Sequence, residues 1–448
     1  MTRIALYLPI EIKKRELDAQ LLLGFAAASN DYTVFIGSHS AIYSLLEQKP
    51  SKSGIYLDKG IPPLSKLKIL SEQVDAICIM DAEISPILSR ELALQEIRSR
   101  VPEGTEEYLN CYFLPSDDAC EAAMEVLNEL HTRIKNTGWP RFDIWNSLGE
   151  EIYREEIIKI KRDFGNYLLF VSSFGDISDP VLHLKQIRKH NPTPSELWSI
   201  ESRQLRFANY KHVIEILKNW DLDADVPPII VRPHPSEKSR IWERDLGRLK
   251  KTFVKSEGDV SKWIAGSIGV IHQGSTVSLQ ARIMGKKLFF FSEVATLNFV
   301  EKAEKISNFV VGNSVPPRRD RDGNWTCEVN PNFSSTTDSN LNMIRSRSSI
   351  DSILCELNKL TSINGYTNYV YKPWKSEFIL RKIRRGLGLI RDEIYWKIGK
   401  LLIAPQSQKI PGNIRSADIE RVRKAIGNNS EIKTEKLGVN LWCIESAT

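Results

Sequence analysis

Short apolar runs alternate with segments of helical hydrophobic spacing over roughly the first 135 residues. Runs rich in β-branched and aromatic residues predict strands, and apolar positions three and four apart predict helices. The predicted strands of this first series are Ile4–Pro9, Thr33–Gly37, Gly54–Asp58, Val74–Met80 and Cys111–Pro115. Helices are predicted between most of them, the first over Lys14–Ala28, and another over Asp117–Ile134. Strands that alternate with helices in this way predict a parallel βαβ sheet.

A stretch rich in turn-forming residues, Asn136–Asn146, interrupts this pattern, and Pro140 ends the preceding helix. A second alternating series follows, with a long helix predicted over 195–219. Its predicted strands are Asn166–Ser173, Pro227–Pro235, Thr252–Val254, Ile268–His272, Lys287–Phe291 and Phe309–Val311. The polar, pattern-free residues 312–343 predict a mobile loop.

The two series predict an α/β protein with two Rossmann-like, doubly wound domains that face a central cleft. The chain has 448 residues, and a single core stops growing at about 250–300 residues, so two domains are expected. The predicted boundaries are 1–140 for the first domain, 141–165 for a hinge and linking helix, 166–345 for the second domain and 346–448 for a basic helical extension.

Composition excludes several classes of protein. Hydrophobic residues make up 42% and charged residues 26% of the chain, which is ordinary for a globular protein. There is no apolar run of about 18 residues, and the N-terminal sequence lacks the features of a signal peptide, so a cytoplasmic location is expected. The six cysteines show neither a CxxC pair nor zinc-ligand spacing, so they are expected to be reduced and no metal is expected.

The first candidate site is the stretch HQGST, which directly follows a predicted strand. His272 and Gly274 interrupt the apolar run, and Ser275 or Thr276 can cap the helix that follows. In open parallel sheets ligands bind beyond the carboxyl ends of the strands, where helix N-termini favour an anion. The stretch therefore predicts a phosphate site, and a capped helix with nothing bound is the alternative.

A second cluster of the same kind ends the run Ile229–Val231. Arg232, His234 and Ser236 follow it in a loop stiffened by two prolines, and such side chains pair with phosphate or with the charge of a leaving group. Two strand ends in one half of the chain predict a shared nucleotide site, to which the strand-end Ser172 and Ser173 also belong. No G-x-G-x-x-G or P-loop sequence accompanies them, which disfavours dinucleotide oxidoreductases and NTPases.

The paired motifs RPHP and GST…GK resemble those of the GT-B glycosyltransferases of bacterial surface polysaccharide assembly. The most similar group is that of surface carbohydrate biosynthesis proteins, akin to the Kdo and nonulosonic-acid transferases that use CMP-sugars. Three further stretches resemble the N-terminal and hinge signatures of that group: PIEIKKRELDAQLLLG, GIYLDKGI and GWPRFDIW. The resemblance covers roughly residues 1–310 and implies a GT-B fold.

The resemblance also implies roles for particular residues. His234 would contact the donor phosphate, and Ser275 and Thr276 would hold the same phosphate or the cytidine ribose. Two positions depart from the group's pattern: Gln280 stands where a ribose-binding Glu is usual, and MDAEI (Met80–Ile84) replaces an acidic DEEG-like loop. The first departure leaves the identity of the nucleotide open, and the second removes the glycine of the acidic loop.

Glycosyl transfer also needs a carboxylate as base or nucleophile. Because the second domain carries the phosphate side, this carboxylate is expected from the first domain. The candidates at predicted strand ends are Glu11, Asp81 and Glu83, and the candidate sugar or acceptor contacts are Arg15 and Glu16. In the hinge, Arg141 either contacts ligand or pairs with Asp143 to fix the domain angle. An acidic residue that is merely solvated is the alternative for each carboxylate.

Residues 372–402 hold nine basic and three acidic side chains around one apolar helical stripe. A helix of this kind can lie on an anionic inner leaflet, or it can brace the first domain with its charges solvated. No nucleic-acid recognition module accompanies it, so nucleic acid is not an expected partner.

Together these features predict an enzyme: a metal-independent glycosyltransferase without a cofactor. It would move a CMP-activated Kdo or nonulosonate sugar onto a surface glycan or lipid-linked glycan. Two alternatives keep the fold: a CDP-polyol phosphotransferase or a UDP-sugar epimerase. A third is a non-catalytic scaffold of the polysaccharide machinery, which the incomplete acidic loop favours.

Overall fold

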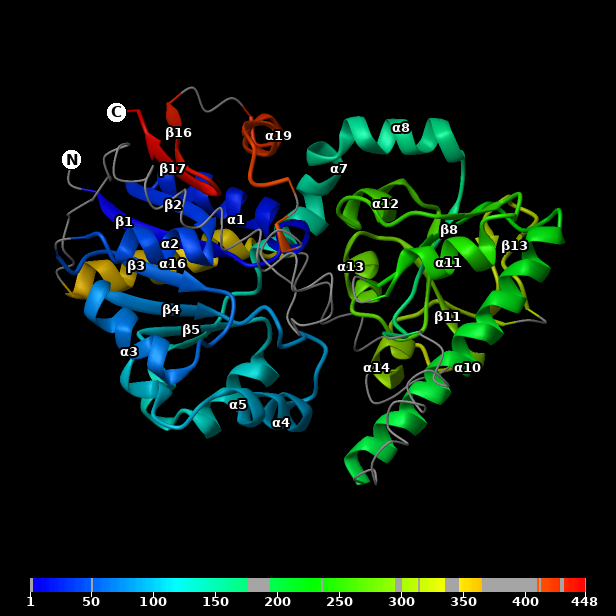
Figure 1. The fold of residues 1–448 in the computed structure, drawn as a ribbon, viewed down its shortest axis with the longest axis horizontal. Coiled ribbons are helices and arrows are strands. Elements are labelled where there is room, and N and C mark those ends of the chain that lie inside the picture. The colour runs from blue at the N-terminus through cyan, green and yellow to red at the C-terminus, as the bar shows by residue number, and fades with distance from the viewer. Residues whose placement is uncertain are drawn as a thin grey trace, which may run out of the picture. The chain divides into compact units, whose positions relative to one another are not determined.

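The chain forms two compact units. Unit 1 comprises residues Met1–Leu148 and Ser346–Thr448, and unit 2 comprises Gly149–Arg345. The computed structural model describes residues 3–49, 51–175, 177, 194–234, 237–294, 300–312, 315–334, 346–364, 409–410, 412–427 and 431–447. The C-terminal residues thus return to the unit that contains the N-terminus. Figure 1 draws both units with their elements labelled.

Unit 1 is built on an eight-stranded sheet of order β16-β17-β2-β1-β3-β4-β5-β6. The strands β1 to β6 are parallel. Their bounds are β1 Ile4–Ile10, β2 Tyr32–Ser38, β3 Ile55–Asp58, β4 Ala76–Met80, β5 Cys111–Leu114 and β6 Ile134–Asn136. The helices of this part are α1 Lys13–Ala28, α2 His39–Leu46, α3 Leu64–Gln73, α4 Arg90–Arg100, α5 Asp117–Val126 and α6 Pro140–Asp143.

The two faces of this sheet are covered by different helices, as the alternation of side chains along each strand requires. Tyr7, Phe35 and Tyr56 point to the face where α2, α3, α4 and α5 supply buried apolar residues. The helix α1 packs on the other face, where Gly24 lies close to Val34. Unit 1 is therefore doubly wound.

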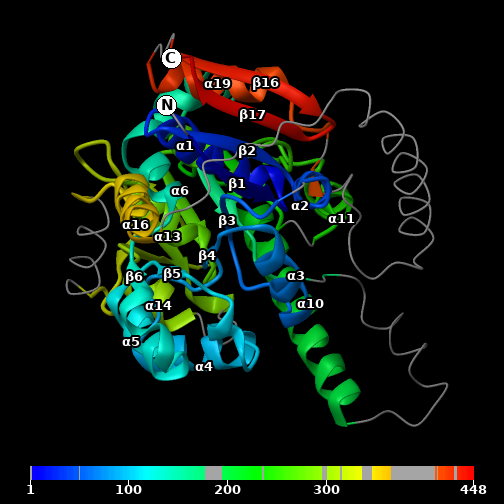
Figure 2. The same ribbon diagram turned by 90° about the vertical axis from the view of Figure 1, so that its left-hand side faces the viewer.

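The C-terminal residues extend this sheet, which the sequence analysis did not predict. The hairpin of β16 (Ile432–Gly438) and β17 (Leu441–Ser446) adds antiparallel to β2, and Figure 2 shows it in red beside β2 and β1. Helix α19 (Ser416–Ala425) is joined to α1 by the ion pairs Arg421–Asp18 and Lys13–Asp418, at 2.8 and 2.6 Å. The described tail therefore braces unit 1.

Unit 2 contains a seven-stranded sheet of order β15-β12-β11-β10-β7-β8-β9, in which β15 alone runs antiparallel to its neighbour. The strands are β7 Leu168–Val171, β8 Ile229–Arg232, β9 Thr252–Val254, β10 Gly269–His272, β11 Lys287–Phe291, β12 Phe309–Val311 and β15 Glu328–Val329. The helices are α7 Gly149–Ile152, α8 Arg154–Phe164, α10 Pro194–Leu222, α11 Ser239–Leu246, α12 Ser261–Gly266, α13 Val277–Ile283 and α14 Val300–Lys305. Buried aromatic residues, among them Trp220 and Trp242, fill one side of its core.

The predicted α/β class is confirmed, and both sheets consist mainly of parallel strands. Two local predictions were wrong. The helix expected to reach Ile134 ends at Val126, because Leu127 leaves the helical region at φ −120° and ψ 63°. Residues 318–329 contain β13 (Arg318–Arg319), β14 (Trp325–Thr326) and β15 where a loop was expected.

The predicted amphipathic helix over 372–402 lies outside the described residues, so both of its proposed roles stay predictions. Within the described part of the chain, no helix combines the length and the apolar character needed to cross a membrane. Helix α16 (Ser349–Asn364) begins the C-terminal part of unit 1, where Asp143 accepts hydrogen bonds from the N–H groups of Ser349 and Ile350, each at 2.9 Å. Asp143 therefore caps α16.

Candidate functional site

Three parallel strands of unit 2 end side by side, with β7 between β8 and β10. The register places Val171 of β7 opposite Arg232 of β8 and opposite His272 of β10. The loops that follow these strands therefore leave the sheet at one edge, which we call the unit 2 edge. Since neighbouring strands lie about 4.8 Å apart, the outer two loops start about 10 Å from each other. Both predicted phosphate motifs lie on this edge.

A buried carboxylate fixes two of these loops to each other. Glu237 is 7% exposed and accepts hydrogen bonds from the Ser172 hydroxyl at 2.5 Å, from the Trp242 indole at 2.9 Å and from the N–H of Phe174 at 2.9 Å. The Ser172 oxygen in turn accepts a hydrogen bond from the His234 N–H at 3.0 Å. Burial raises the pKa of Glu237, against the effect of these hydrogen bonds. The loop that carries His234 is thus held in place by residues of both strands.

Four predicted residues of the unit 2 edge remain in positions that a ligand can reach. His234 and Thr276 are exposed, and Ser173 and Gly274 are half-buried. Ser275 is 7% exposed, and its hydroxyl accepts a hydrogen bond from the first turn of α13. Gly274 has a φ of 99°, a conformation that residues with a Cβ rarely adopt. That these residues together contact a phosphate stays a prediction.

The structure corrects the predicted roles of Arg232 and His272. The Arg232 guanidinium donates to the carbonyls of Lys255, Glu257 and Gly258 at 3.1, 2.8 and 2.9 Å, so it fixes the loop after β9. His272 is fully buried. Its Nδ1 accepts the N–H of Gly274 at 3.3 Å, and its Nε2 lies 2.9 Å from the hydroxyl of Ser307. Both side chains support the edge from within.

Of three further predicted ligand contacts, two have a supporting role in the structure and one lies outside the described residues. Gln280 is buried, and its Nε2 donates to the Ser261 hydroxyl at 2.6 Å, so it joins α13 to α12. Ser172 is 3% exposed and is engaged by Glu237 and His234. Ser236 lies outside the described residues. The first two are therefore supporting residues instead of ligand contacts.

Burial lowers the pKa of His272 to about 3, which predicts how stability depends on pH. The unfolded imidazole binds a proton near pH 6.5 and the folded one only near pH 3, so its contribution is fully present above pH 6.5 and is lost as the pH falls toward 3. We expect the free energy of unfolding to fall by about 1.4 kcal/mol per pH unit from this group within that window.

Urea unfolding at pH 7, 6 and 5 checks this expectation in the wild type and in His272→Gln. The variant should be less stable at pH 7 but should show a shallower loss between pH 6 and 5, because it lacks the proton uptake of one imidazole. Equal slopes for the two proteins would contradict the assignment of a neutral, buried His272.

Gln273 is a residue of the unit 2 edge that the sequence analysis did not single out. It follows β10 directly and is 1% exposed, and neither its Nε2 nor its Oε1 has a hydrogen-bond partner within the chain as described. A buried amide without partners is unfavourable by about 1–3 kcal/mol for each group. The sequence signal that could have identified Gln273 as a site residue was its position inside the HQGST stretch.

The carboxyl ends of β1, β3 and β4 in unit 1 bring together a second group of predicted residues. Lys59, which directly follows β3, has its Nζ 2.8 Å from Glu11, 3.0 Å from Glu16 and 3.5 Å from Glu83. Arg15 pairs with Glu83 at 3.4 Å. We call this set the Lys59 cluster. Lys59 itself was not among the predicted site residues, although it lies in the stretch GIYLDKGI.

Two acidic residues of unit 1 are supporting residues, contrary to prediction. Asp81 is 2% exposed. It accepts hydrogen bonds from Arg100 at 3.0 Å and from the Tyr112 hydroxyl at 2.7 Å. Glu16 is 4% exposed, and it accepts the N–H of Glu11 at 2.7 Å besides pairing with Lys59. Neither side chain is accessible to a sugar.

The two remaining carboxylates, Glu11 and Glu83, are 34% and 40% exposed. Burial raises the pKa of Glu11, but hydrogen bonds from Lys409 and Lys59 outweigh it and bring the pKa to about 2. For Glu83, burial is likewise outweighed by the charges of Arg15 and Lys59, so the pKa lies below its usual value. Both are ionised at neutral pH.

Arg141 lies near the same cluster. Its Nη2 is 3.5 Å from the carbonyl of Ala82, and its guanidinium lies over the ring of Trp139 at 4.7 Å. Its charge also contributes to the lowered pKa of Glu83. Asp143 caps α16, and the predicted Arg141–Asp143 pair stays a prediction.

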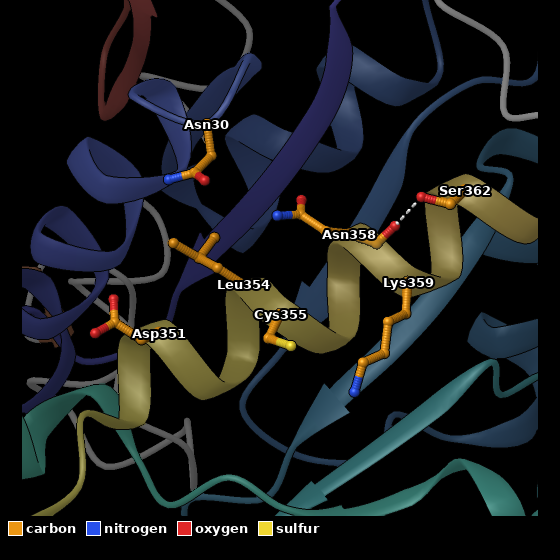
Figure 3. A pocket seen from close by; sticks show the side chains of 7 residues that line it. All are labelled: Asn30, Asp351, Leu354, Cys355, Asn358, Lys359 and Ser362. Atoms are coloured by element: carbon orange, nitrogen blue, oxygen red, sulfur yellow. Dashed lines mark hydrogen bonds between the residues drawn. The ribbon is translucent and has the colours of Figure 1, made fainter.

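Two of the hollows on the described part of unit 1 bear on the predicted site. One, of about 550 Å³, is lined by Glu11, Lys59 and Glu83 of the Lys59 cluster, and also by His39 and Asp58; we call it the unit 1 pocket. The other, of about 640 Å³, lies along α16 and contains none of the predicted site residues. Figure 3 shows its lining, where the Ser362 hydroxyl bonds to the carbonyl of Asn358 in its own helix. Of the predicted site residues, Glu11 and Glu83 thus line the smaller of these two hollows.

No protein-family model matches the chain, and no curated protein matches its sequence. Among solved structures, it is similar to the UDP-GlcNAc 2-epimerase of Methanocaldococcus jannaschii in complex with UDP-GlcNAc and UDP, with 13% identity, a TM-score of 0.45, and 80% of this chain and 100% of that chain covered. The UDP-GlcNAc 2-epimerase of Neisseria meningitidis bound to UDP-GlcNAc is 10% identical, with a TM-score of 0.44. The match covers 79% of this chain and 99% of that chain. The wall teichoic acid polymerase TagF, as a histidine-to-asparagine variant, is 10% identical, with a TM-score of 0.36. The match covers 81% of this chain and 90% of that chain.

Proposed function

We propose that the chain is a glycosyltransferase that moves a nucleotide-activated sugar onto a bacterial surface glycan or lipid-linked glycan. The observation that carries the proposal is the unit 2 edge, where His234, Thr276 and Ser173 follow three neighbouring strands at one end of a parallel sheet. Ligands of open α/β sheets bind at this end. The donor that the sequence resemblance favours is a CMP-activated Kdo or nonulosonate.

The proposed donor contacts suit a phosphate group. An imidazole, hydroxyls and main-chain N–H groups can stabilise the charge that develops on a departing phosphate. The hydrogen bonds of Glu237 hold the His234 loop before any ligand arrives, so little ordering is left to do on binding. Gln273 supports the same assignment, because a ligand or an ordered water at this edge would supply the partners that its amide lacks.

The proposed role of unit 1 is to bind the acceptor in the unit 1 pocket. Carboxylates and ammonium groups side by side can accept from and donate to the hydroxyls of a sugar, and the pocket volume of about 550 Å³ lies in the range usual for small-molecule sites. Of the predicted carboxylates, Glu83 is the most exposed, so we propose that it orients the sugar or stabilises positive charge at the anomeric carbon. Arg15 would hold Glu83 in place.

We further propose that donor binding needs no metal ion, because the His234 imidazole and main-chain N–H groups can donate hydrogen bonds to the phosphate. Titration calorimetry with CMP, UDP and GDP in the presence of EDTA tests both the nucleotide and this requirement. We expect CMP to bind at least tenfold more tightly than UDP or GDP, and EDTA to leave its affinity unchanged.

Other outcomes of this titration would overturn parts of the proposal. Equal affinities for the three nucleotides would remove the case for a CMP-sugar. Preference for UDP, followed by conversion of UDP-GlcNAc without an acceptor, would point to the epimerase reaction. Transfer of a phosphodiester from CDP-glycerol would identify a phosphotransferase, and binding with no turnover of any donor would favour the scaffold.

A further inference from the structure

The unit 1 pocket lies at a point where the order of the strands changes direction. The strand β1 is flanked by β2 on one side and by β3 on the other, so the connections from the two halves of the sheet diverge there and leave a crevice at the carboxyl ends. Residues that follow β1, β2 and β3 line the pocket, among them Glu11, His39 and Lys59. It is therefore the natural ligand site of this sheet.

The two more exposed carboxylates of the pocket, Glu11 and Glu83, are poorly suited to take a proton. Glu11 is paired with Lys59 and Lys409, which bring its pKa to about 2. Glu83 faces Arg15 and Lys59. A general base works best with a pKa near the operating pH, and a carboxylate held between cations is far below it. The acceptor hydroxyl must therefore find another base.

His39 is positioned to act as this base, because it lines the same pocket. It is the first residue of α2 and directly follows Ser38, whose hydroxyl caps the helix by accepting the N–H of Ala41 at 3.3 Å. The imidazole is 29% exposed, and its Nε2 lies 3.6 Å from Oδ1 of Asp58. Its ring also lies 6.0 Å from that of Tyr43. An imidazole on the pocket wall is thus backed by a carboxylate.

Asp58 is held firmly behind His39. It is 3% exposed and accepts hydrogen bonds from the Tyr56 hydroxyl at 2.9 Å and from the N–H of Lys59 at 2.8 Å. A buried carboxylate facing one ring nitrogen fixes the orientation and tautomer of an imidazole and stabilises the imidazolium that forms when the other nitrogen takes a proton. The separation of 3.6 Å is an ion-pair distance, slightly longer than a hydrogen bond.

We propose that His39 is the general base of the reaction and that Asp58 is its positioning residue. This inference rests on the proposed function. The proton of the acceptor hydroxyl moves to Nδ1 of His39, and the hydroxyl oxygen forms the new bond to the anomeric carbon. The bond from that carbon to the donor phosphate breaks, and its electron pair leaves with the phosphate oxygen. The imidazolium later releases its proton to water.

The test measures CMP release from CMP-Kdo and from CMP-N-acetylneuraminate, with water or simple glycosides as acceptors. His39→Gln should lower kcat about 100- to 10,000-fold, the range for loss of a general base, and should leave the Kd of CMP unchanged. Asp58→Asn, which keeps the size of the side chain, should lower kcat less and should also leave the Kd unchanged. His131→Gln, an exposed histidine of the same unit, is the matched control and should behave as the wild type.

The pH profile separates catalysis from a structural effect. Wild-type kcat should fall on the acid side as the base becomes protonated, and this limb should disappear in His39→Gln. The titratable and charged groups that face His39 or share its pocket are Asp58, Tyr43, Lys59, Lys66, Glu11, Glu83, Arg100 and Lys409.

The outcomes distinguish this inference from the function on which it rests. An active wild type with an equally active His39→Gln, or with an unchanged acid limb, would overturn the role of His39 and leave the transferase standing. A wild type that releases CMP from neither donor would overturn both the role of His39 and the proposed transferase function. If His39→Gln also lost affinity for CMP or unfolded, while Asp58→Asn kept the wild-type rate and profile, the general-base role would again be rejected.

Discussion

Replacing Glu237 by Ala is expected to lower the free energy of unfolding by about 3–5 kcal/mol, since the change leaves several buried donors without an acceptor. These donors are the Ser172 hydroxyl, the Trp242 indole and the N–H groups of Phe174 and Gly175. The loops after β7 and β8 would lose their connection, so CMP affinity should fall together with stability. Urea unfolding and titration calorimetry measure the two effects.

A graded series sharpens this expectation. Glu237→Gln keeps one acceptor oxygen and should lower stability by about 1–3 kcal/mol, less than the alanine variant. Glu243→Gln changes an exposed carboxylate on α11 and serves as the matched control, with an effect within about 0.5 kcal/mol. A Glu237→Ala protein as stable as this control would show that the carboxylate does not hold the loops together.

The second large effect is expected at His234. Replacement by Ala should lower kcat about 100- to 1,000-fold, the range for loss of a donor that stabilises transition-state charge, while stability changes by less than about 1 kcal/mol because the side chain is exposed. The main chain at this position is already held by Ser172 and by the Glu237 N–H at 2.8 Å, so the loop should keep its course. Steady-state turnover of a CMP-sugar and urea unfolding provide the comparison.

His212→Ala supplies the control for this variant, because His212 is an exposed histidine of unit 2 paired with Glu293. It should keep the wild-type turnover. Normal turnover in His234→Ala would remove His234 from the mechanism, and a stability loss as large as that of Glu237→Ala would show that its role is structural.

Most strands were predictable because each is an unbroken apolar run. Ile4–Ile10, Lys287–Phe291 and Phe309–Val311 were found within one residue of their ends, since a strand buried on both faces needs apolar residues at every position. The C-terminal hairpin gave a weaker signal: β16 reads IKTEKLG, with mostly exposed or half-exposed side chains. Its place beside β2 depends on a pairing across some 400 residues, which local pattern does not encode.

The candidate site was predictable to the level of the sheet edge but not to the level of individual roles. Parallel strands share one carboxyl edge, so the motifs after β8 and β10 were bound to lie on the same side. The sequence did not reveal that β7 lies between them. It also did not reveal that Arg232 and His272 are used inside the protein, because their partners are carbonyls and a hydroxyl 23 to 35 residues away.

By itself, then, the sequence determined the α/β class, the order of most strands and helices in the two alternating series and the loops on which His234, Ser275 and Glu83 lie. Tertiary structure decided which polar side chains are buried as supports and which stay accessible. The physical reason is that a buried charge must find partners wherever the fold brings them: Glu237 meets Ser172 from 65 residues away, and Glu11 meets Lys409 from 398 residues away. Hydrophobic periodicity is local, whereas the pairing of polar groups is a property of the folded chain.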